Sequence, residues 1–178
     1  GRFGGSGTIL RDGDKGRPYV LTNRHVVEGA GTNKAEITLH DGKKYPATLI
    51  QRDDRADLAL LTVDTDDELP FVALADAEPK EGEPLKQAGY PLGRRTEKSG
   101  PAIGYRGWST NGVPVYDTGI PQISGDSGSG QFDRNGRLVA VNWGGGQNHG
   151  VSVGLGDIRR FVRGVITLPV EVLKQVGK

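Results

Sequence analysis

Cysteine and methionine are both absent from the 178-residue sequence. Without cysteine, the chain has no disulfide bonds, no thiolate metal site and no cysteine nucleophile. Long apolar runs are absent too: stretches such as residues 58–61 and 139–141 are only a few residues long, whereas a membrane-spanning helix needs about 18–20. Neither charge is in excess, with 23 Lys and Arg against 22 Asp and Glu. Composition therefore gives no case for a nucleic-acid or membrane partner.

Glycine is abundant instead, at 29 of 178 residues, against about 7% in average proteins. The glycines have no fixed period, and many separate short runs rich in Val, Ile, Leu and Thr. This arrangement is typical of an all-β protein, which needs turns and bulges between its strands. The length predicts one domain or two small lobes. The first residue is Gly1 rather than Met, so we expect a processed or excised product.

Short alternating or apolar runs predict roughly ten to twelve strands, which favours β-barrels or a sandwich. The predicted strands are residues 5–10, 19–22, 35–39, 44–50, 58–63, 85–90, 103–109, 113–118, 130–132, 138–143 and 150–155. Residues 71–84, which include Pro79 and Pro84, are expected to cross from a first half to a second.

Only the tail of the chain has helical spacing. Ile158, Phe161, Val162 and Val165 lie at i, i+3, i+4 and i+7 after Asp157. This pattern predicts a helix with Asp157 as its cap. A second turn or short helix is expected at residues 169–176.

The segment Gly125-Asp126-Ser127-Gly128-Ser129-Gly130 has the composition of a nucleophile turn. A nucleophilic serine needs an exposed hydroxyl on a sharp turn and nearby backbone N–H groups that can bind an oxyanion. Flanking glycines allow both, because they tolerate unusual φ angles and let a substrate approach closely. Taken alone, the same pattern also fits an ordinary polar surface turn.

Two further segments supply a base and a carboxylate. His25 directly follows a predicted buried strand, and a histidine fixed there can act as a general base near neutral pH. Asp57 leads straight into the next apolar strand, where a carboxylate can orient a histidine ring. His40, in contrast, sits beside a predicted turn and is expected to be solvated. The order His25, Asp57, Ser127 is one of the known orders of a catalytic triad.

With these segments in this order, the sequence resembles the chymotrypsin-like (trypsin-fold) serine proteases over nearly its whole length. The stretches that carry the resemblance are Gly5-Ser6-Gly7-Thr8-Ile9, residues 21–27 around His25, Asp57-Leu58-Ala59-Leu60-Leu61, Gly89-Tyr90-Pro91-Leu92-Gly93, Gly125-Asp126-Ser127-Gly128, Asn142-Trp143-Gly144 and Gly150-Val151-Ser152-Val153. The Gly89–Gly93 stretch is similar to one in bacterial Deg-type (HtrA) proteases. The chain also resembles secreted glutamyl-endopeptidase-type enzymes, and we expect no PDZ domain within it.

One residue departs from the Deg pattern. Deg-type enzymes usually carry Asn before the serine, where this chain has Asp126. In the wider family a freed amino terminus can pair with an aspartate at this position. Gly1 begins a glycine-rich arm without an apolar anchor, so we do not expect that pairing here.

The resemblance implies an all-β fold of two six-stranded antiparallel β-barrels, with the active site between them and a C-terminal helix. The first barrel would comprise residues 1–78 and the second residues 79–178. The resemblance also implies a serine endopeptidase in which Ser127 attacks the scissile carbonyl, His25 transfers its proton and Asp57 orients His25. The N–H groups of Gly125 and Ser127 would form the oxyanion hole. A protein or peptide substrate is the expected partner, and the reaction needs no metal or organic cofactor.

A primary substrate pocket is implied as well. Its expected lining is Pro121, Gln122, Asn142, Trp143, Gly144, Gly150 and Ser152. In this family a carboxylate at position 121 would select Lys or Arg, and a histidine at position 141 would select Glu. Pro121 and Val141 provide neither, although His149 lies close to the pocket rim in sequence. Because Gly144 and Gly150 have no side chains to block the walls, we expect broad cleavage after uncharged residues such as Leu, Phe or Tyr.

Three alternatives stand beside this hypothesis. A catalytically silent binding module would keep the fold, but such proteins usually lose one triad residue, and all three are present here. A structural β-domain would contain the serine motif by chance. An excised viral polyprotein protease, acting in the host cytoplasm, would share the chemistry. The Deg-like first half favours a secreted or periplasmic bacterial protease over the viral one.

Overall fold

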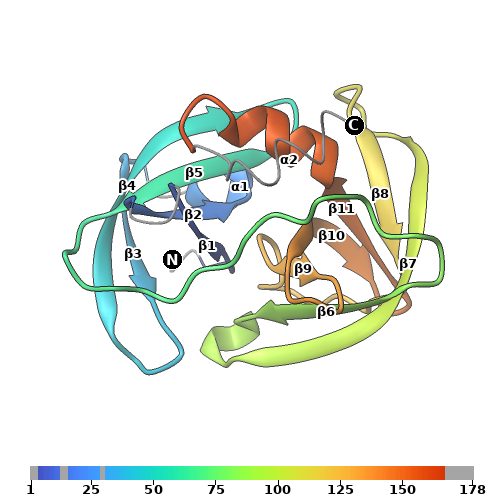
Figure 1. Ribbon diagram of the computed structural model, residues 1–178, viewed down its shortest axis with the longest axis horizontal. Helices are drawn as coiled ribbons and strands as arrows, with labels where there is room; N and C mark the ends of the chain where they lie inside the picture. The colour runs from blue at the N-terminus through green and yellow to red at the C-terminus, as the bar shows by residue number, and fades with distance from the viewer. Residues whose placement is uncertain (1–3, 13–15, 29–30, 167–178) are drawn as a thin grey trace.

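The computed structural model describes residues 4–12, 16–28 and 31–166. Gly1 and the turn or helix predicted at residues 169–176 lie outside the described residues. Within them the chain forms two β-lobes side by side, with one helix lying over their junction (Figure 1).

The first lobe is a single antiparallel sheet of five strands, in the order β1-β2-β5-β4-β3. Its strands are β1 (Thr8–Arg11), β2 (Pro18–Thr22), β3 (Lys34–Thr38), β4 (Lys44–Asp53) and β5 (Leu58–Val63). The expectation of a six-stranded barrel in this lobe therefore differs from the five strands found among the described residues.

The second lobe is a closed barrel of six strands, as the resemblance implied, in the order β10-β11-β8-β7-β6-β9. Its strands are β6 (Pro84–Gly89), β7 (Thr96–Trp108), β8 (Pro114–Thr118), β9 (Gly130–Phe132), β10 (Leu138–Gly146) and β11 (His149–Gly154). A short 3-10 turn, η1 (Pro91–Gly93), follows β6.

The crossover between the lobes passes along both of them (Figure 1). The Val72 N–H donates to the Ile9 carbonyl of the first lobe, at 3.0 Å. Three residues later the Ala75 N–H donates to the Leu138 carbonyl of the second lobe, at 2.9 Å. Leu74 forms a single parallel bridge with Leu138. The crossover thus contributes to both lobes without completing a sixth strand in the first.

The continuous apolar run of β5 explains how the two lobes share a core. On β5, Leu58 and Leu60 face a cluster that continues through Leu138 and Ile158 of the second lobe. Leu61 on the opposite face joins a separate cluster confined to the first lobe. Successive strand residues point to opposite faces, so the continuous apolar run of β5 buries both. The larger cluster crosses the junction and fixes the two lobes against each other.

Two helices complete the described part of the fold. The short helix α1 (Arg24–Glu28) follows β2, and α2 (Leu155–Val162) follows β11. The prediction of Asp157 as the cap of the tail helix is wrong, because α2 begins two residues earlier, after Gly154, and buries Leu155 in the core. Asp157 lies instead in the first helical turn, where its charge is favourable to the helix dipole.

Helix α2 also joins the lobes. Gln51 of β4 donates from Nε2 to the carbonyl of Phe161, at 2.6 Å. The helix sits above the boundary between the sheet and the barrel (Figure 1). Val165, expected on its apolar face, follows the helix end and packs against the main cluster.

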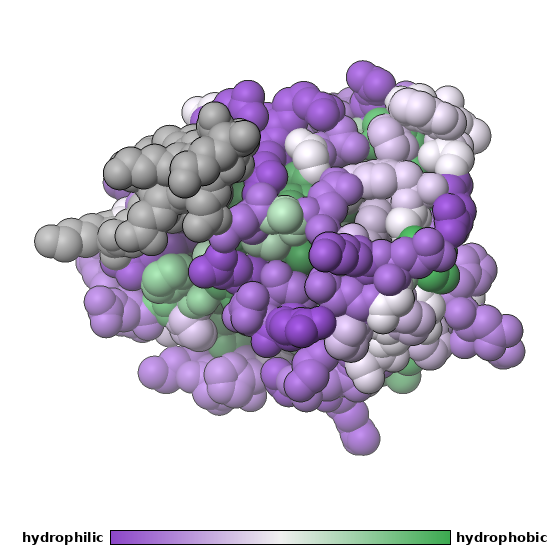
Figure 2. Space-filling model, turned by 45° about the vertical axis from the view of Figure 1, so that its right-hand side comes forward, coloured by the Kyte–Doolittle hydropathy of each residue, from purple (hydrophilic) through white to green (hydrophobic). Residues whose placement is uncertain are grey.

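The face shown in Figure 2 is mostly hydrophilic, with apolar residues in small separate groups. None of the helices in the described residues has the length and apolar composition that a membrane crossing requires.

Candidate active site

His25 lies on α1, directly after the buried end of β2. Its ring Nδ1 is 2.6 Å from Oδ2 of Asp57, and its backbone N–H donates to Oδ1 of the same carboxylate, at 2.9 Å. Both oxygens of the Asp57 carboxylate therefore contact His25. With Nδ1 engaged as a donor, Nε2 is the ring atom left to accept a proton. The structure thus brings the two predicted residues, His25 and Asp57, into direct contact.

Asp57 adopts an uncommon backbone conformation for a residue other than glycine, with φ of 56°. Its carbonyl accepts hydrogen bonds from Asn23 Nδ2 and from the Arg24 N–H, both at 3.1 Å. These contacts hold the left-handed turn, which costs free energy unless its surroundings fix it. The Asp57 side chain is 22% exposed, against 63% for Asp54. Its place before β5 thus makes it the better shielded of these two carboxylates.

The nucleophile loop, residues 121–129, connects β8 with β9 and contains Ser127. Gly125 and Gly128 have φ angles of 94° and 88°, in the region that strongly favours glycine. Gly128 is also tightly enclosed: an added Cβ would lie 2.0 Å from the Ser6 carbonyl oxygen and 2.3 Å from Thr22 Oγ1. The conformation of the turn thus requires the two glycines of the Gly-Asp-Ser-Gly pattern.

Backbone N–H groups in the nucleophile loop divide into two sets. Those of Asp126, Gly128 and Ser129 donate to carbonyl oxygens at 3.1, 2.8 and 3.0 Å. Within the part of the chain that the structure describes, the N–H groups of Ser124, Gly125 and Ser127 have no acceptor. Of these, Gly125 and Ser127 supply two unengaged donors next to the serine, which is what binding of an oxyanion requires.

The nucleophile loop is tied to the lobe that carries His25. The Ser6 N–H donates to the Ser127 carbonyl oxygen, at 2.8 Å. A Cβ placed on Gly5 would lie 2.6 Å from the Val26 side chain and 3.1 Å from that same oxygen. The loop and α1 therefore face each other across Gly5. No hydrogen bond joins the His25 ring to the Ser127 hydroxyl among the described residues; such bonds often tighten only when substrate binds.

The expected pocket residues differ in their burial. Gln122, Asn142, Gly150 and Ser152 are buried, Trp143 and Gly144 are half-buried, and Pro121 is exposed. Gln122 exchanges two hydrogen bonds of 2.9 Å with Gln87 of β6. Behind them, Gln131 donates to Gln87 and accepts from Ser152. A connected network of buried amides and one hydroxyl therefore occupies this part of the second barrel.

Gly150 does not border open space, contrary to the expectation from sequence. An added Cβ would lie 2.8 Å from Nε2 of Gln122. At Gly145, an added Cβ would lie 2.8 Å from Cγ of the same glutamine. Gly144 is close to Val151, whose methyl group would lie 3.3 Å from an added Cβ. The Gln122 side chain therefore fills the space that Gly150 was expected to leave free.

Three residues around the site make contacts that the sequence did not reveal. Ser6 Oγ donates to the Gly125 carbonyl, Gln87 exchanges hydrogen bonds with Gln122, and Lys98 forms an ion pair with Asp126. Their partners lie far along the chain, and Ser6 and Gly125 are 119 positions apart. No local pattern predicts such contacts. Among the described residues, no group of three or more His, Asp or Glu side chains is placed to hold a metal ion.

Comparison with known proteins places this architecture in a family. Residues 5–141 match the model of the trypsin-like peptidase domain. The chain is 36% identical over 157 residues to the periplasmic pH-dependent serine endoprotease DegQ of Escherichia coli, covering 85% of this chain and 33% of DegQ. It is 36% identical over 143 residues to a probable DegP-like periplasmic serine endoprotease of Marinomonas sp., covering 78% and 29%. The chain thus spans about a third of the length of these relatives.

Solved structures give the same result. The Rv3671c protease of M. tuberculosis, in an inactive form, superposes with a TM-score of 0.76 at 25% identity, covering 90% of this chain and 83% of that one. The HtrA-type protease AlgW, bound to a decapeptide, gives a TM-score of 0.74 at 26% identity, covering 85% and 48%. The chain belongs to the family of trypsin-like peptidase domains.

Proposed function

We propose that this chain is the catalytic domain of a serine endopeptidase that hydrolyses peptide bonds through an acyl-enzyme. The observation that carries the proposal is the contact of both Asp57 carboxylate oxygens with His25, at 2.6 and 2.9 Å. A carboxylate that holds one histidine in this way fixes the ring's orientation and tautomer and stabilises the imidazolium formed during catalysis. The family membership supports the same chemistry.

In the proposed hydrolysis, each chemical step is carried out by a named group of the site. Ser127 Oγ attacks the scissile carbonyl while His25 Nε2 takes its proton. The N–H groups of Gly125 and Ser127 bind the oxyanion of the tetrahedral intermediate. His25 then gives the proton to the leaving amine, and a water molecule releases the acyl group by the same route. The boundary between the two lobes is proposed to lie near residue 78, which places His25 and Asp57 on one side of the site and Ser127 on the other.

We propose a periplasmic or secreted location and a protein or peptide substrate. DegQ and the DegP-like relative are named as periplasmic endoproteases, and AlgW was solved with a decapeptide. These bacterial relatives support the bacterial alternative over the viral one.

Gln122 directs the proposed specificity toward small uncharged residues, such as Ala or Val, before the scissile bond. Its buried amide lies over Gly150 and against Gly145, and the Gln87 amide holds it there. A large side chain would have to displace an amide from a satisfied network, which leaves polar groups unpaired. This replaces the preference for Leu, Phe or Tyr that was expected from open glycine walls.

A Ser127→Ala variant tests the proposed function. Removal of a triad serine lowers turnover by roughly 10⁶ in an unrelated enzyme of this kind, and we expect casein hydrolysis to fall to background while thermal unfolding stays unchanged. Ser99→Ala, an exposed serine on β7, is the matched control and should keep wild-type activity. Retention of more than about a hundredth of the wild-type rate would exclude Ser127 as the nucleophile.

A Gln122→Ala variant tests the proposed specificity. Peptides that differ only in the residue before the scissile bond should be cleaved fastest by the wild type when that residue is Ala or Val. The variant should gain on the Phe peptide, by about 10-fold or more in kcat/KM relative to Ala. Gln147→Ala, an exposed glutamine between β10 and β11, should leave the ranking unchanged. Wild-type preference for Phe or Leu would show that Gln122 does not limit the pocket.

A further inference from the structure

A buried carboxylate lies immediately before the proposed nucleophile. The side chain of Asp126 is 2% exposed. Placing a charge in the interior is costly unless opposite charge and hydrogen-bond donors surround it. One donor is local: the Ile123 N–H donates to Asp126 Oδ2, at 2.8 Å. A local donor alone leaves the charge of the carboxylate unbalanced.

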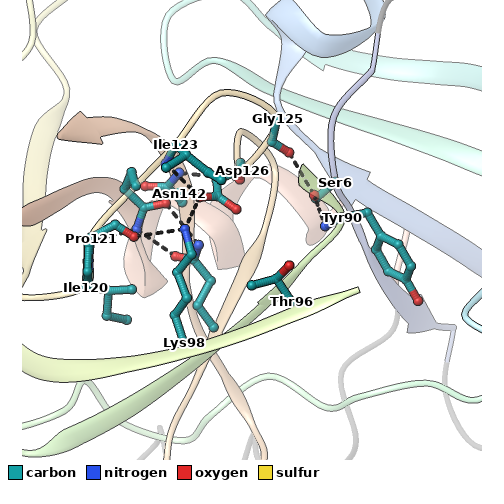
Figure 3. A network of polar contacts seen from close by, with 12 residues as sticks. Ser6, Tyr90, Thr96, Lys98, Ile120, Pro121, Ile123, Gly125, Asp126 and Asn142 are labelled. Atoms are coloured by element: carbon teal, nitrogen blue, oxygen red, sulfur yellow. Dashed lines mark hydrogen bonds and ion pairs between the residues drawn. The ribbon is translucent and has the colours of Figure 1, made fainter. Parts of the chain in front are cut away.

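Lys98 provides the opposite charge. It lies on β7, paired in register with Gln87 of β6, and its side chain is 17% exposed. Its ammonium group forms an ion pair with Asp126 Oδ2 and donates to the Pro121 carbonyl, at 3.1 Å. Figure 3 shows the Lys98 side chain rising from its strand into the nucleophile loop. The cation thus comes from the rigid barrel wall.

The two acceptors of Lys98 stand at opposite ends of one loop segment. Pro121 begins it and Asp126 ends it, so a single ammonium group closes the segment. Inside lies Gly125, with its left-handed φ and its unengaged N–H. If Asp126 lost its partner and turned toward water, the adjoining peptide units would turn with it. The direction of the Gly125 N–H therefore depends on the ion pair.

We propose that Lys98 is a positioning residue for catalysis: by pairing with Asp126, it holds the nucleophile loop in the conformation that presents the oxyanion-binding N–H groups. The inference rests on the proposed function, because it assigns those N–H groups to the oxyanion. It goes beyond that function by naming a residue on β7, outside the triad, on which turnover depends.

Kinetics of Lys98→Met, Lys98→Arg and a matched control test the proposal. Loss of one oxyanion donor costs about 10²–10³ in kcat, so Lys98→Met should lower kcat by about 10²-fold while KM changes little. A peptide boronic acid, whose tetrahedral adduct places an oxygen at the oxyanion site, should bind correspondingly more weakly. Lys98→Arg keeps the cation and should recover much of the kcat. Lys86→Met, an exposed lysine on β6, should match the wild type.

A double-mutant cycle with Asp126→Asn separates positioning from folding. The amide can still accept from the Ile123 N–H but carries no charge that needs Lys98. The Lys98→Met loss in kcat should therefore shrink by at least about 10-fold in the Asp126→Asn background. If the single variant fails to fold, the comparison of the double variant with Asp126→Asn alone remains, and the two should have similar kcat.

Two results would overturn the inference. One is a folded Lys98→Met variant with the kcat of the Lys86→Met control. The other is a Lys98→Met loss in kcat that is equally large in the wild-type and in the Asp126→Asn background, since Lys98 would then not act through the carboxylate. Both outcomes differ from failure of the proposed function, in which Ser127→Ala would keep its activity.

Discussion

Replacing Ser6 with Ala removes one hydroxyl that joins three segments of the protein. Ser6 precedes β1 and is 5% exposed. Its Oγ donates to the Gly125 carbonyl, at 3.0 Å, and accepts from the Tyr90 N–H, at 2.8 Å. Figure 3 shows Ser6 between these two partners. The hydroxyl therefore links the first lobe to the nucleophile loop and to the turn after β6.

The expected destabilisation follows from those two partners. Loss of a hydrogen bond that leaves a buried group unpaired costs about 1–3 kcal/mol. Both partners are only partly buried, so we expect Ser6→Ala to lower the free energy of unfolding by about 2–4 kcal/mol in total. The main-chain bonds of Ser6, to the Ser127 carbonyl and from Thr22 Oγ1, remain in the variant. The loss therefore belongs to the hydroxyl alone.

Urea denaturation with linear extrapolation measures this loss. Ser99→Ala, in which an exposed serine is replaced, should change the free energy of unfolding by no more than about 0.5 kcal/mol. Under conditions where Ser6→Ala remains folded, its kcat should also fall, because the Gly125 carbonyl loses its anchor. A free energy of unfolding equal to that of Ser99→Ala would refute the assigned role of the hydroxyl.

Two further predictions remain. Replacing His25 with Ala should lower peptidase activity to background, because its ring is the base that accepts the serine proton, whereas His40→Ala, at an exposed position, should keep wild-type activity; equal activity in the two variants would exclude His25 as the base. Burial raises the pKa of Tyr116 to about 12, so its contribution to stability is complete below about pH 10 and is lost as pH rises toward 12. Between pH 9 and 11, the free energy of unfolding should therefore fall by about 1 kcal/mol less in Tyr116→Phe than in the wild type. An equal fall in the variant and the wild type would show that ionisation of Tyr116 does not contribute to unfolding.

Strands with strong local patterns were predictable from the sequence. The predicted ranges 58–63 and 130–132 coincide with β5 and β9, because a dense apolar run or a glycine-bounded turn identifies each. β7 begins at Thr96, seven residues before the predicted start. Its first part carries polar residues and Pro101, so neither alternation nor β-propensity marks it. Pairing with β6, a neighbouring strand of the barrel, imposes the extended conformation on this part of β7.

The two helices also show that local sequence patterns did not predict where these elements begin and end. The five-residue α1 is too short for a helical period to emerge, and the contacts of Asp57 with its first residues hold it in place. The start of α2 was misplaced because burial of Leu155, a tertiary effect, outweighed the capping preference of Asp157.

In the candidate site, residue types with distinctive chemistry were predictable and supporting residues were not. His25 and Asp57 do lie together, as their blocks predicted. Gln87 and Lys98 appeared as ordinary polar residues, and Gln122 was expected only as part of the pocket lining. Their partners across the barrel explain why all three side chains are shielded from solvent. Gly150 was misjudged for the same reason, since the glutamine that fills its space comes from another segment.

Covalent labelling decides whether Ser127 is a nucleophile that His25 activates. The protein is treated with a fluorophosphonate, which reacts with activated serines, and the modified residue is mapped by mass spectrometry. We predict one adduct per chain, on Ser127, and loss of the adduct in His25→Ala but not in His40→Ala. Absence of labelling in a folded, substrate-cleaving protein, or an adduct on another residue, would show that Ser127 is not the activated nucleophile.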